Sequence, residues 1–82
     1  MRVLEIIEDL FSEKYGCLPE DVTMEATLDD LNVTVYERED MALTLEEYFG
    51  VGIDDAALNG FETVEDVVGY IEDALNEQEA AV

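Results

Sequence analysis

The chain carries few side chains that could do chemistry on a bound substrate. Cys17 is a potential thiol nucleophile, but the sequence contains no histidine, so neither a Cys–His nor a Ser–His pair can form. Cys17 is also the single cysteine, which excludes an intrachain disulfide. No glycine-rich phosphate-binding loop is present. We therefore predict no catalytic residue and no enzymatic activity.

Acidic pairs are the next candidates, because neighbouring carboxylates can bind cations or transfer protons. Asp29–Asp30 and Asp54–Asp55 are such pairs. Neither pair lies in the loop pattern of an EF-hand, and a zinc site would need more Cys or His ligands. We predict no metal site, and an acidic, cation-responsive protein is kept as a third hypothesis behind the two given below.

The charge of the chain limits its partners. The formal net charge is −20, from 23 acids against three bases. Such a surface repels nucleic-acid phosphates and anionic membranes, and it attracts proteins that carry Lys and Arg patches. No segment is long and apolar enough to span a membrane, and the first residues do not resemble a signal peptide. We expect a cytoplasmic monomer that binds a basic protein surface, with no nucleic acid partner and no membrane insertion.

The spacing of apolar residues predicts an all-α domain over residues 1–78, with three principal helices and a short one, and a frayed tail at 79–82. The first helix spans about residues 2–15 and ends near Gly16. A long connection, 17–33, follows it, and the short helix lies at 54–59. The connection is expected to be anchored in the core by Val22, Leu28 and Leu31.

Two helix starts are marked by capping residues. Thr34 and Glu37 have the spacing of a capping box, so the Thr34 oxygen is expected to accept a backbone N–H at the start of the second helix. Thr63 is expected to cap the last helix, with Asp66 in its first turn. The predicted inward stripes are Met41, Leu45, Tyr48 and Phe49 on the second helix, which ends at Gly50, and Val64, Val67, Val68, Ile71 and Leu75 on the last.

The segment DDLNVTVYEREDMALTLEEYF, from Asp29 to Phe49, resembles the centre of an acyl carrier protein. The family pattern there is similar to D-x-L-G-x-D-S-L, followed by an acidic residue and an apolar helix that ends E-E-x-F. Asn32 falls on the family glycine and tolerates the same left-handed backbone. Val35 falls on the family serine. The other matched positions are Asp30 and Leu31 on D-x-L, Thr34 on the aspartate and Tyr36 on the leucine.

The resemblance extends over nearly the whole chain. The stretch PEDVTMEATLDDL is similar to the family's loop after the first helix. The stretch YFGVGIDDAALNGFETVEDVVGYIEDAL resembles the family's E-F-x-I-x-I-x-D segment, its short third helix and its T-V-x-D-x-V-x-Y-I close. The resemblance implies a four-helix bundle with a long first connection and a short third helix.

In that family the serine hydroxyl carries the 4'-phosphopantetheine arm, whose thiol carries the acyl group. Val35 has no hydroxyl, so the resemblance implies a carrier-like domain without its attachment point, and we predict no cofactor. The alternative is a working acyl carrier with an unusual attachment at Thr34 and 4'-phosphopantetheine as its cofactor. Glu39, where the family has an apolar residue that faces the acyl chain, and Arg38 are further departures from the pattern.

The resemblance also implies docking through the second helix on an enzyme of acyl-carrier-dependent synthesis, as in fatty acid or polyketide biosynthesis. Two competing interpretations are that the first two residues of the helix pack against the loop, and that its acids form a solvated face on which Arg38 pairs with a neighbouring acid. Our first hypothesis is a binding module rather than a carrier. The predicted partner-binding residues are Val35, Tyr36, Glu37, Asp40, Leu43 and Glu47.

Overall fold

The computed structural model describes the backbone of residues 3–80 and the side chains of residues 3–77. Its elements are α1 (Val3–Tyr15), a 3-10 turn (Pro19–Asp21), α2 (Val35–Phe49), α3 (Asp55–Gly60) and α4 (Val64–Ala80). Residues 3–80 contain no β-strand, and a single isolated bridge joins Thr27 to Thr63. The predicted all-α class, with three principal helices and a short third one, is confirmed.

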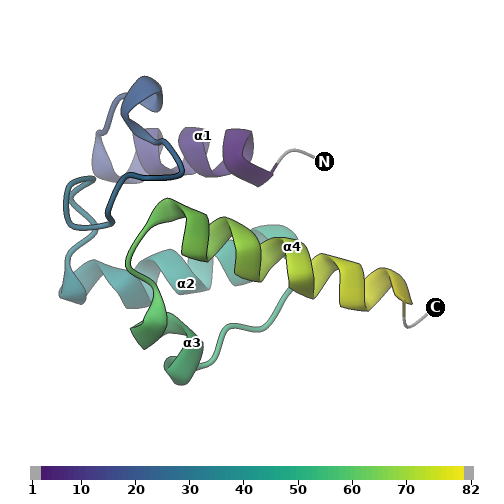
Figure 1. Ribbon diagram of the computed structural model, residues 1–82. Helices are drawn as coiled ribbons and strands as arrows, with labels where there is room; N and C mark the ends of the chain where they lie inside the picture. The colour runs from purple at the N-terminus through teal and green to yellow at the C-terminus, as the bar shows by residue number, and fades with distance from the viewer. Residues whose placement is uncertain (1–2, 81–82) are drawn as a thin grey trace.

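The three long helices lie side by side, and α3 lies below them (Figure 1). α2 and α4 run in the same direction, and α1 runs against both. Because α2 and α4 are parallel, the chain returns between them through the segment that contains α3. The segment between α1 and α2 passes across one end of the bundle.

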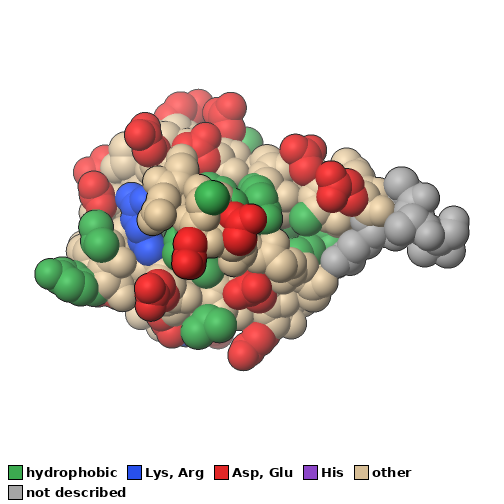
Figure 2. Space-filling model, turned by 90° about the horizontal axis from the view of Figure 1, so that it is seen from below, with side chains coloured by type: hydrophobic (Ala, Val, Ile, Leu, Met, Phe, Trp, Pro, Cys, Tyr) green, Lys and Arg blue, Asp and Glu red, His purple; other side chains and the backbone are tan. Residues whose placement is uncertain are grey.

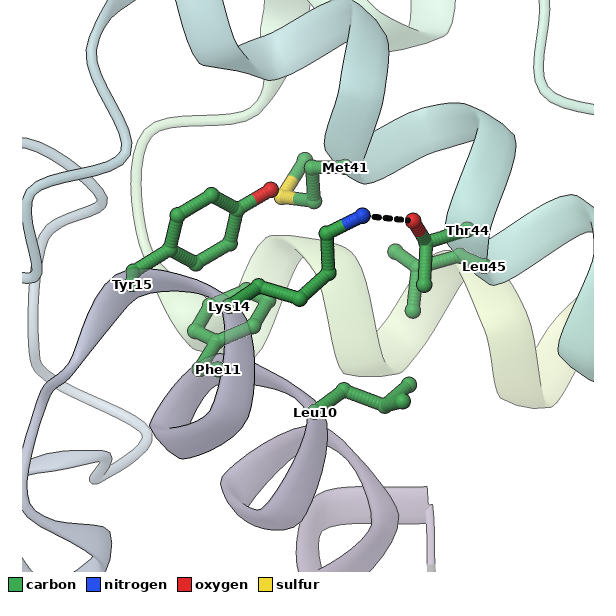
Figure 3. A pocket seen from close by; sticks show the side chains of 7 residues that line it. All are labelled: Leu10, Phe11, Lys14, Tyr15, Met41, Thr44 and Leu45. Carbon is green, nitrogen blue, oxygen red and sulfur yellow. Dashed lines mark hydrogen bonds between the residues drawn. The ribbon is translucent and has the colours of Figure 1, made fainter.

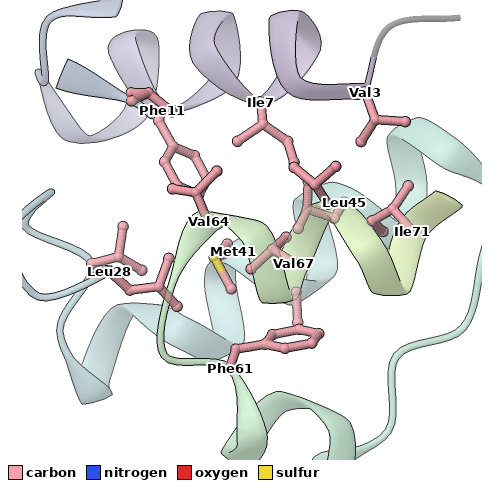
Figure 4. Close-up of a cluster of buried hydrophobic side chains, with 14 of the residues drawn as sticks. Val3, Ile7, Phe11, Leu28, Met41, Leu45, Phe61, Val64, Val67 and Ile71 are labelled. Carbon is pink, nitrogen blue, oxygen red and sulfur yellow. The ribbon is translucent and has the colours of Figure 1, made fainter. Parts of the chain in front are cut away.

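The core forms where the apolar stripes of the long helices meet (Figure 4). Ile7 and Phe11 enter it from α1, and they are 0% and 1% exposed. Met41, Leu45 and Phe49 come from α2, and Val64, Val67, Val68 and Ile71 from α4, so these predicted inward positions are confirmed as buried.

Two positions of the predicted stripes behave differently. Tyr48 is 57% exposed, so its assignment to the core is wrong. Buried Ala42 shifts the inward arc of α2 away from Tyr48, whose ring instead lies edge-on against that of Phe49 with centroids 5.2 Å apart. Leu75 is only partly buried, because it lies near the end of α4.

The connection between α1 and α2 is held by the three predicted anchors. Val22, Leu28 and Leu31 are all buried. Asn32 takes a left-handed backbone with φ of 65°, which agrees with its expected tolerance of that conformation. The connection also contains the Pro19–Asp21 turn, which apolar periodicity did not predict.

The carboxyl ends of α1 and α2 lie at the predicted glycines, whereas α4 runs further than predicted. α1 ends before Gly16, which has a φ of 70°, and α2 ends at Gly50, with a φ of 68°. α4 continues through Ala80, into the segment 79–82 that the sequence assigned to a frayed tail, and residues 81–82 lie outside the described residues. None of the helices within residues 3–80 is long and apolar enough to cross a membrane.

Candidate functional site

The amino end of α2 presents apolar side chains to solvent. Val35 is 73% exposed and Tyr36 is 93% exposed. These fractions rule out the interpretation in which both side chains pack against the preceding loop, because packing would bury most of their area. An exposed valine followed by an exposed tyrosine at a helix start is an accessible contact surface.

The cap of α2 is weaker than the sequence predicted. Thr34 is the N-cap residue, with φ of −75° and ψ of 175°, but its side chain accepts no backbone N–H. Its hydroxyl instead donates to the Glu37 carboxylate, with 3.4 Å between Oγ1 and Oε1. The predicted Thr34 cap is therefore wrong, because the hydroxyl turns towards the Glu37 side chain rather than towards the backbone. As a result, the hydroxyl remains exposed.

The hydroxyl groups near this helix start are few. The single serine of the chain is Ser12, which lies in α1. Its oxygen is buried, with no hydrogen-bond partner among the described residues. A serine is thus absent from α2 and from the loop before it, and Thr34 supplies the aliphatic hydroxyl at the amino end of α2.

Four of the predicted partner-binding residues form a row along α2. Tyr36, Asp40, Leu43 and Glu47 follow one another at helical spacing and are all exposed, Leu43 by 59%. Val35 lies on the side of this row that faces α3, where it lines a groove with Leu58. Glu37 is only half-exposed and lies towards Tyr15 of α1. The structure therefore brings the predicted residues together as one row with a flanking residue on each side.

Asp40 contacts Lys14 and Tyr15 of α1, and Figure 3 shows these two side chains lining a crevice between α1 and α2. Its carboxylate accepts from Lys14 at 2.9 Å and from the Tyr15 hydroxyl at 3.3 Å. Lys14 Nζ also donates to Thr44 Oγ1 at 2.9 Å. The Lys14 hydrogen bond lowers the pKa of Asp40, while burial and the Asp40 charge raise the pKa of Tyr15. Asp40 thus contributes less free negative charge than the sequence suggested.

Arg38 points away from this row. Its Nη1 donates to the Phe61 carbonyl at 2.7 Å, and its Nε is buried without a partner among residues 3–77. The expected ion pair with a neighbouring acid is wrong, because the short carbonyl contact to Phe61 holds the guanidinium. Arg38 also lines the groove between α2 and α3, a space of about 500 Å³, together with Val35, Glu39, Asp55, Leu58 and Asn59.

Figure 2 views the molecule from the side of α3. Acidic side chains are spread over this face, with separate hydrophobic side chains between them and a small basic patch. This face therefore presents no large apolar patch, and a partner would contact scattered carboxylates around small apolar side chains.

The other chemical candidates have structural roles. The Cys17 thiol donates to the Phe11 carbonyl at 3.3 Å, and burial raises its pKa, which disfavours the reactive thiolate. Asp54 accepts from the Ala57 N–H at 2.8 Å and caps α3. Within the described residues, no three Asp, Glu or Cys side chains converge as metal ligands would.

Sequence reasoning missed the roles of Lys14, Tyr15 and Arg38. Lys14 and Tyr15 lie 30 and 25 positions from their partners Thr44 and Asp40. No local pattern connects such distant residues. The one signal in the sequence is the scarcity of basic residues, because each Arg or Lys in so acidic a chain has many potential acceptors.

Comparisons with known proteins identify the family of the chain. The model of the family described as "Phosphopantetheine attachment site" matches residues 5–71. The acyl carrier protein of Thermotoga maritima is 41% identical over 75 residues, which cover 90% of this chain and 93% of that protein. The acyl carrier protein of Coprothermobacter proteolyticus is 32% identical, with 90% and 92% covered.

Another relative is the meromycolate extension acyl carrier protein of Mycobacterium tuberculosis, 34% identical over 87% of this chain and 63% of its own length. A crystal structure of an acyl carrier protein from Thermotoga maritima has a TM-score of 0.76 at 24% identity, over 90% of this chain and 92% of that one. These relatives are carrier proteins rather than enzymes, which confirms the prediction of no enzymatic activity. The chain belongs to the acyl carrier protein family.

Proposed function

We propose that this chain is a binding module of the acyl carrier protein family that lacks the attachment residue and docks through α2 on a basic protein surface. The observation that carries this proposal is Val35 at the start of α2. This position, where the family pattern has a serine, is occupied by a valine that is 73% exposed. Its partner is an enzyme of acyl-carrier-dependent synthesis, as in fatty acid or polyketide biosynthesis. The module acts as a cytoplasmic monomer.

The side chains at the start of α2 do not fit the covalent attachment of 4'-phosphopantetheine at Val35. The phosphodiester needs a hydroxyl oxygen, and Val35 has only methyl groups. The chain's one serine, Ser12, is on α1 with a buried oxygen, so it cannot substitute for the missing group. This arrangement favours a domain that keeps the shape of a carrier without its cargo arm.

The exposed row on α2 supports docking. Tyr36 is 93% exposed and offers a large apolar ring, while Leu43 adds a second apolar contact seven positions further on. Glu47 adds a carboxylate to the row, and Asp40, paired with Lys14, is expected to contribute less. Aromatic anchors supply most of the energy of an interface, whereas charges at its rim steer the encounter.

A working carrier that is modified at Thr34 is the alternative, and one observation favours it. The Thr34 hydroxyl caps no backbone N–H and makes a single 3.4 Å bond to Glu37. It is therefore available to a modifying enzyme that accepts a secondary alcohol one residue away from the usual position.

Intact-mass measurement separates the two functions. The chain is co-expressed with a broad-specificity phosphopantetheinyl transferase, beside the variants Val35→Ser and Thr34→Val. We expect no added arm on the wild type and a complete arm on Val35→Ser. An arm on the wild type that disappears in Thr34→Val would establish the carrier function and overturn the binding-only proposal.

The Val35→Ser variant also tests the docking surface, because its rate of modification reports how well the transferase docks. In this background Tyr36→Ala should slow modification about tenfold, through loss of an anchor. Glu47→Lys should slow it about threefold, through weaker steering. The matched control is Glu72→Lys, an exposed acid on α4, which should leave the rate unchanged. Equal effects of all three changes would place the docking surface elsewhere.

A further inference from the structure

We propose that Lys14 masks Asp40, so that a basic partner must displace the Lys14 ammonium before its own Lys or Arg can pair with this carboxylate. The inference rests on the proposed function, because Asp40 belongs to the exposed row that Tyr36, Leu43 and Glu47 complete on α2. It gives Lys14, a residue of α1, control over how strongly that row attracts a partner.

The Lys14 ammonium is positioned by two acceptors on successive turns of α2. Its Nζ lies 2.9 Å from Asp40 Oδ2 and donates to Thr44 Oγ1, also at 2.9 Å. The Thr44 hydroxyl in turn donates to the backbone carbonyl of Asp40 at 2.9 Å, which fixes the oxygen that Lys14 reaches. Figure 3 shows Lys14 extending from α1 across the crevice to Thr44. The ammonium is therefore held beside the carboxylate by a second contact that does not involve the ion pair.

Tyr15 directs the Asp40 carboxylate towards α1. Its hydroxyl donates to Oδ2 at 3.3 Å, so the same carboxylate oxygen accepts from both Lys14 and Tyr15. The Tyr15 ring lies edge-on against that of Phe11, with centroids 5.5 Å apart, which places the hydroxyl. Two neighbouring residues of α1 thus hold one acid of the docking row.

The pairing weakens the attraction that Asp40 exerts on a distant base. Opposite charges 2.9 Å apart act as a dipole, whose field falls off faster with distance than that of a single charge. Glu47, by contrast, forms no ion pair within residues 3–77 and keeps its full charge. The row therefore steers a partner through Glu47, while Asp40 is withheld.

The mask is open to displacement. The Lys14 and Asp40 side chains are 35% and 55% exposed, so water and a partner reach both. Exposed ion pairs contribute little net stability, and a second base that brings further contacts can therefore replace Lys14. Lys14 thus lowers the affinity for every basic partner and favours those that supply a base at Asp40.

The rate of modification of the Val35→Ser variant, at transferase and substrate concentrations below saturation, tests the mask. In this background Lys14→Met keeps an apolar stem over the crevice and removes the ammonium, and it should raise the rate about threefold. Adding Asp40→Asn should remove the gain, because no carboxylate is left to unmask. Lys14→Arg, which keeps the positive charge, should keep the original rate.

Two matched controls separate masking from other effects of the change. Asn76→Asp, at an exposed position of α4, alters the net charge by the same amount and should leave the rate unchanged. Tyr15→Phe removes the neutral donor to Asp40 but keeps the ring beside Phe11. It should also leave the rate unchanged, because the ion pair stays.

Two rate results would overturn the proposal. One is a gain in Lys14→Met no larger than that in Asn76→Asp, and the other is a gain that survives Asp40→Asn. Neither result touches the proposed function as long as Tyr36→Ala still slows modification, so the two failures are distinguishable.

NMR titration of the Asp40 carboxyl tests the pair without any partner or transferase, in the wild type and in Lys14→Met. The Lys14 hydrogen bond is the main cause that lowers the pKa of Asp40, so this pKa should rise in Lys14→Met. An unchanged pKa would mean that Lys14 does not pair with Asp40 in solution. The mask would then be refuted, even if the Val35→Ser variant is never modified.

Discussion

α2 and α4 start with nearly the same residues, TVYE at 34–37 and TVED at 63–66, yet the two starts are constructed differently. At α4, the Thr63 hydroxyl accepts from the Asp66 N–H at 3.3 Å and the Asp66 carboxylate accepts from the Thr63 N–H at 3.2 Å. At α2, the hydroxyl of Thr34 bonds only to the Glu37 carboxylate. The reciprocal cap is complete in one helix and missing in the other.

The tertiary surroundings of the two starts explain this difference. The Val64 and Glu65 N–H groups donate to the carbonyls of Ala26 and Met24, at 3.0 and 3.1 Å, so the loop between α1 and α2 holds α4 in place. The N–H groups of Val35 and Tyr36 have no acceptor within residues 3–80. Val64 is 0% exposed and Val35 is 73% exposed. One start is part of the core, and the other is exposed to solvent.

The largest expected effect on stability comes from replacing each valine at a helix start by serine, in two separate variants. Val64→Ser should lower the free energy of unfolding by about 3 kcal/mol, because it leaves a cavity and buries a hydroxyl. Val35→Ser should change it by less than about 0.5 kcal/mol, because the side chain is exposed. Urea denaturation followed by circular dichroism measures both values. A comparable loss in the two variants would mean that the start of α2 is packed as firmly as that of α4.

Much of the fold could be predicted from the sequence, because apolar periodicity reports directly which helix faces meet. Ile7, Leu45 and Ile71 lie in the core for this reason. Asn32 could also be anticipated, since few residues other than glycine tolerate its φ of 65°. Tyr48 could not, because the small side chain of Ala42 gave no hint that it would extend the buried arc on the side away from Tyr48.

The candidate site was less predictable than the fold. The exposed Val35 and Tyr36 followed from their place at a helix start, but the missing Thr34 cap did not, since TVYE and TVED satisfy the same local rule. The difference arises from contacts with a loop that ends before residue 34. The contacts of Lys14 and Arg38 also join residues 23 or more positions apart, which no local pattern can specify.

A smaller effect is expected when the two threonines are changed to alanine. Thr63→Ala should cost about 1 kcal/mol of unfolding free energy, because it removes a side-chain acceptor for a helix N–H. Thr34→Ala should cost less than about 0.5 kcal/mol, because its hydroxyl accepts no backbone N–H. Thermal and urea unfolding of both variants give the comparison. An equal cost would show that Thr34 caps α2 in solution.

The smallest effect on stability is expected from the acidic residue in the first turn of each helix, Asp66 in α4 and Glu37 in α2, and it depends on pH. The N–H groups of Glu62 and Thr63 favour the carboxylate form of Asp66 and lower its pKa below 3.8. A lowered folded-state pKa stabilises the fold above the unfolded-state value, and the contribution disappears as the pH falls through the folded-state pKa. Asp66→Asn should therefore cost about 0.5 kcal/mol at pH 7, a value reduced by solvent screening, and nothing below the folded pKa. Glu37→Gln should leave stability unchanged across this range, because the Glu37 carboxylate accepts from the Thr34 hydroxyl and from no backbone N–H. Urea denaturation at pH 7 and at pH values below 3.8 measures both variants, and a pH-independent cost for Asp66→Asn would assign its role to shape rather than charge.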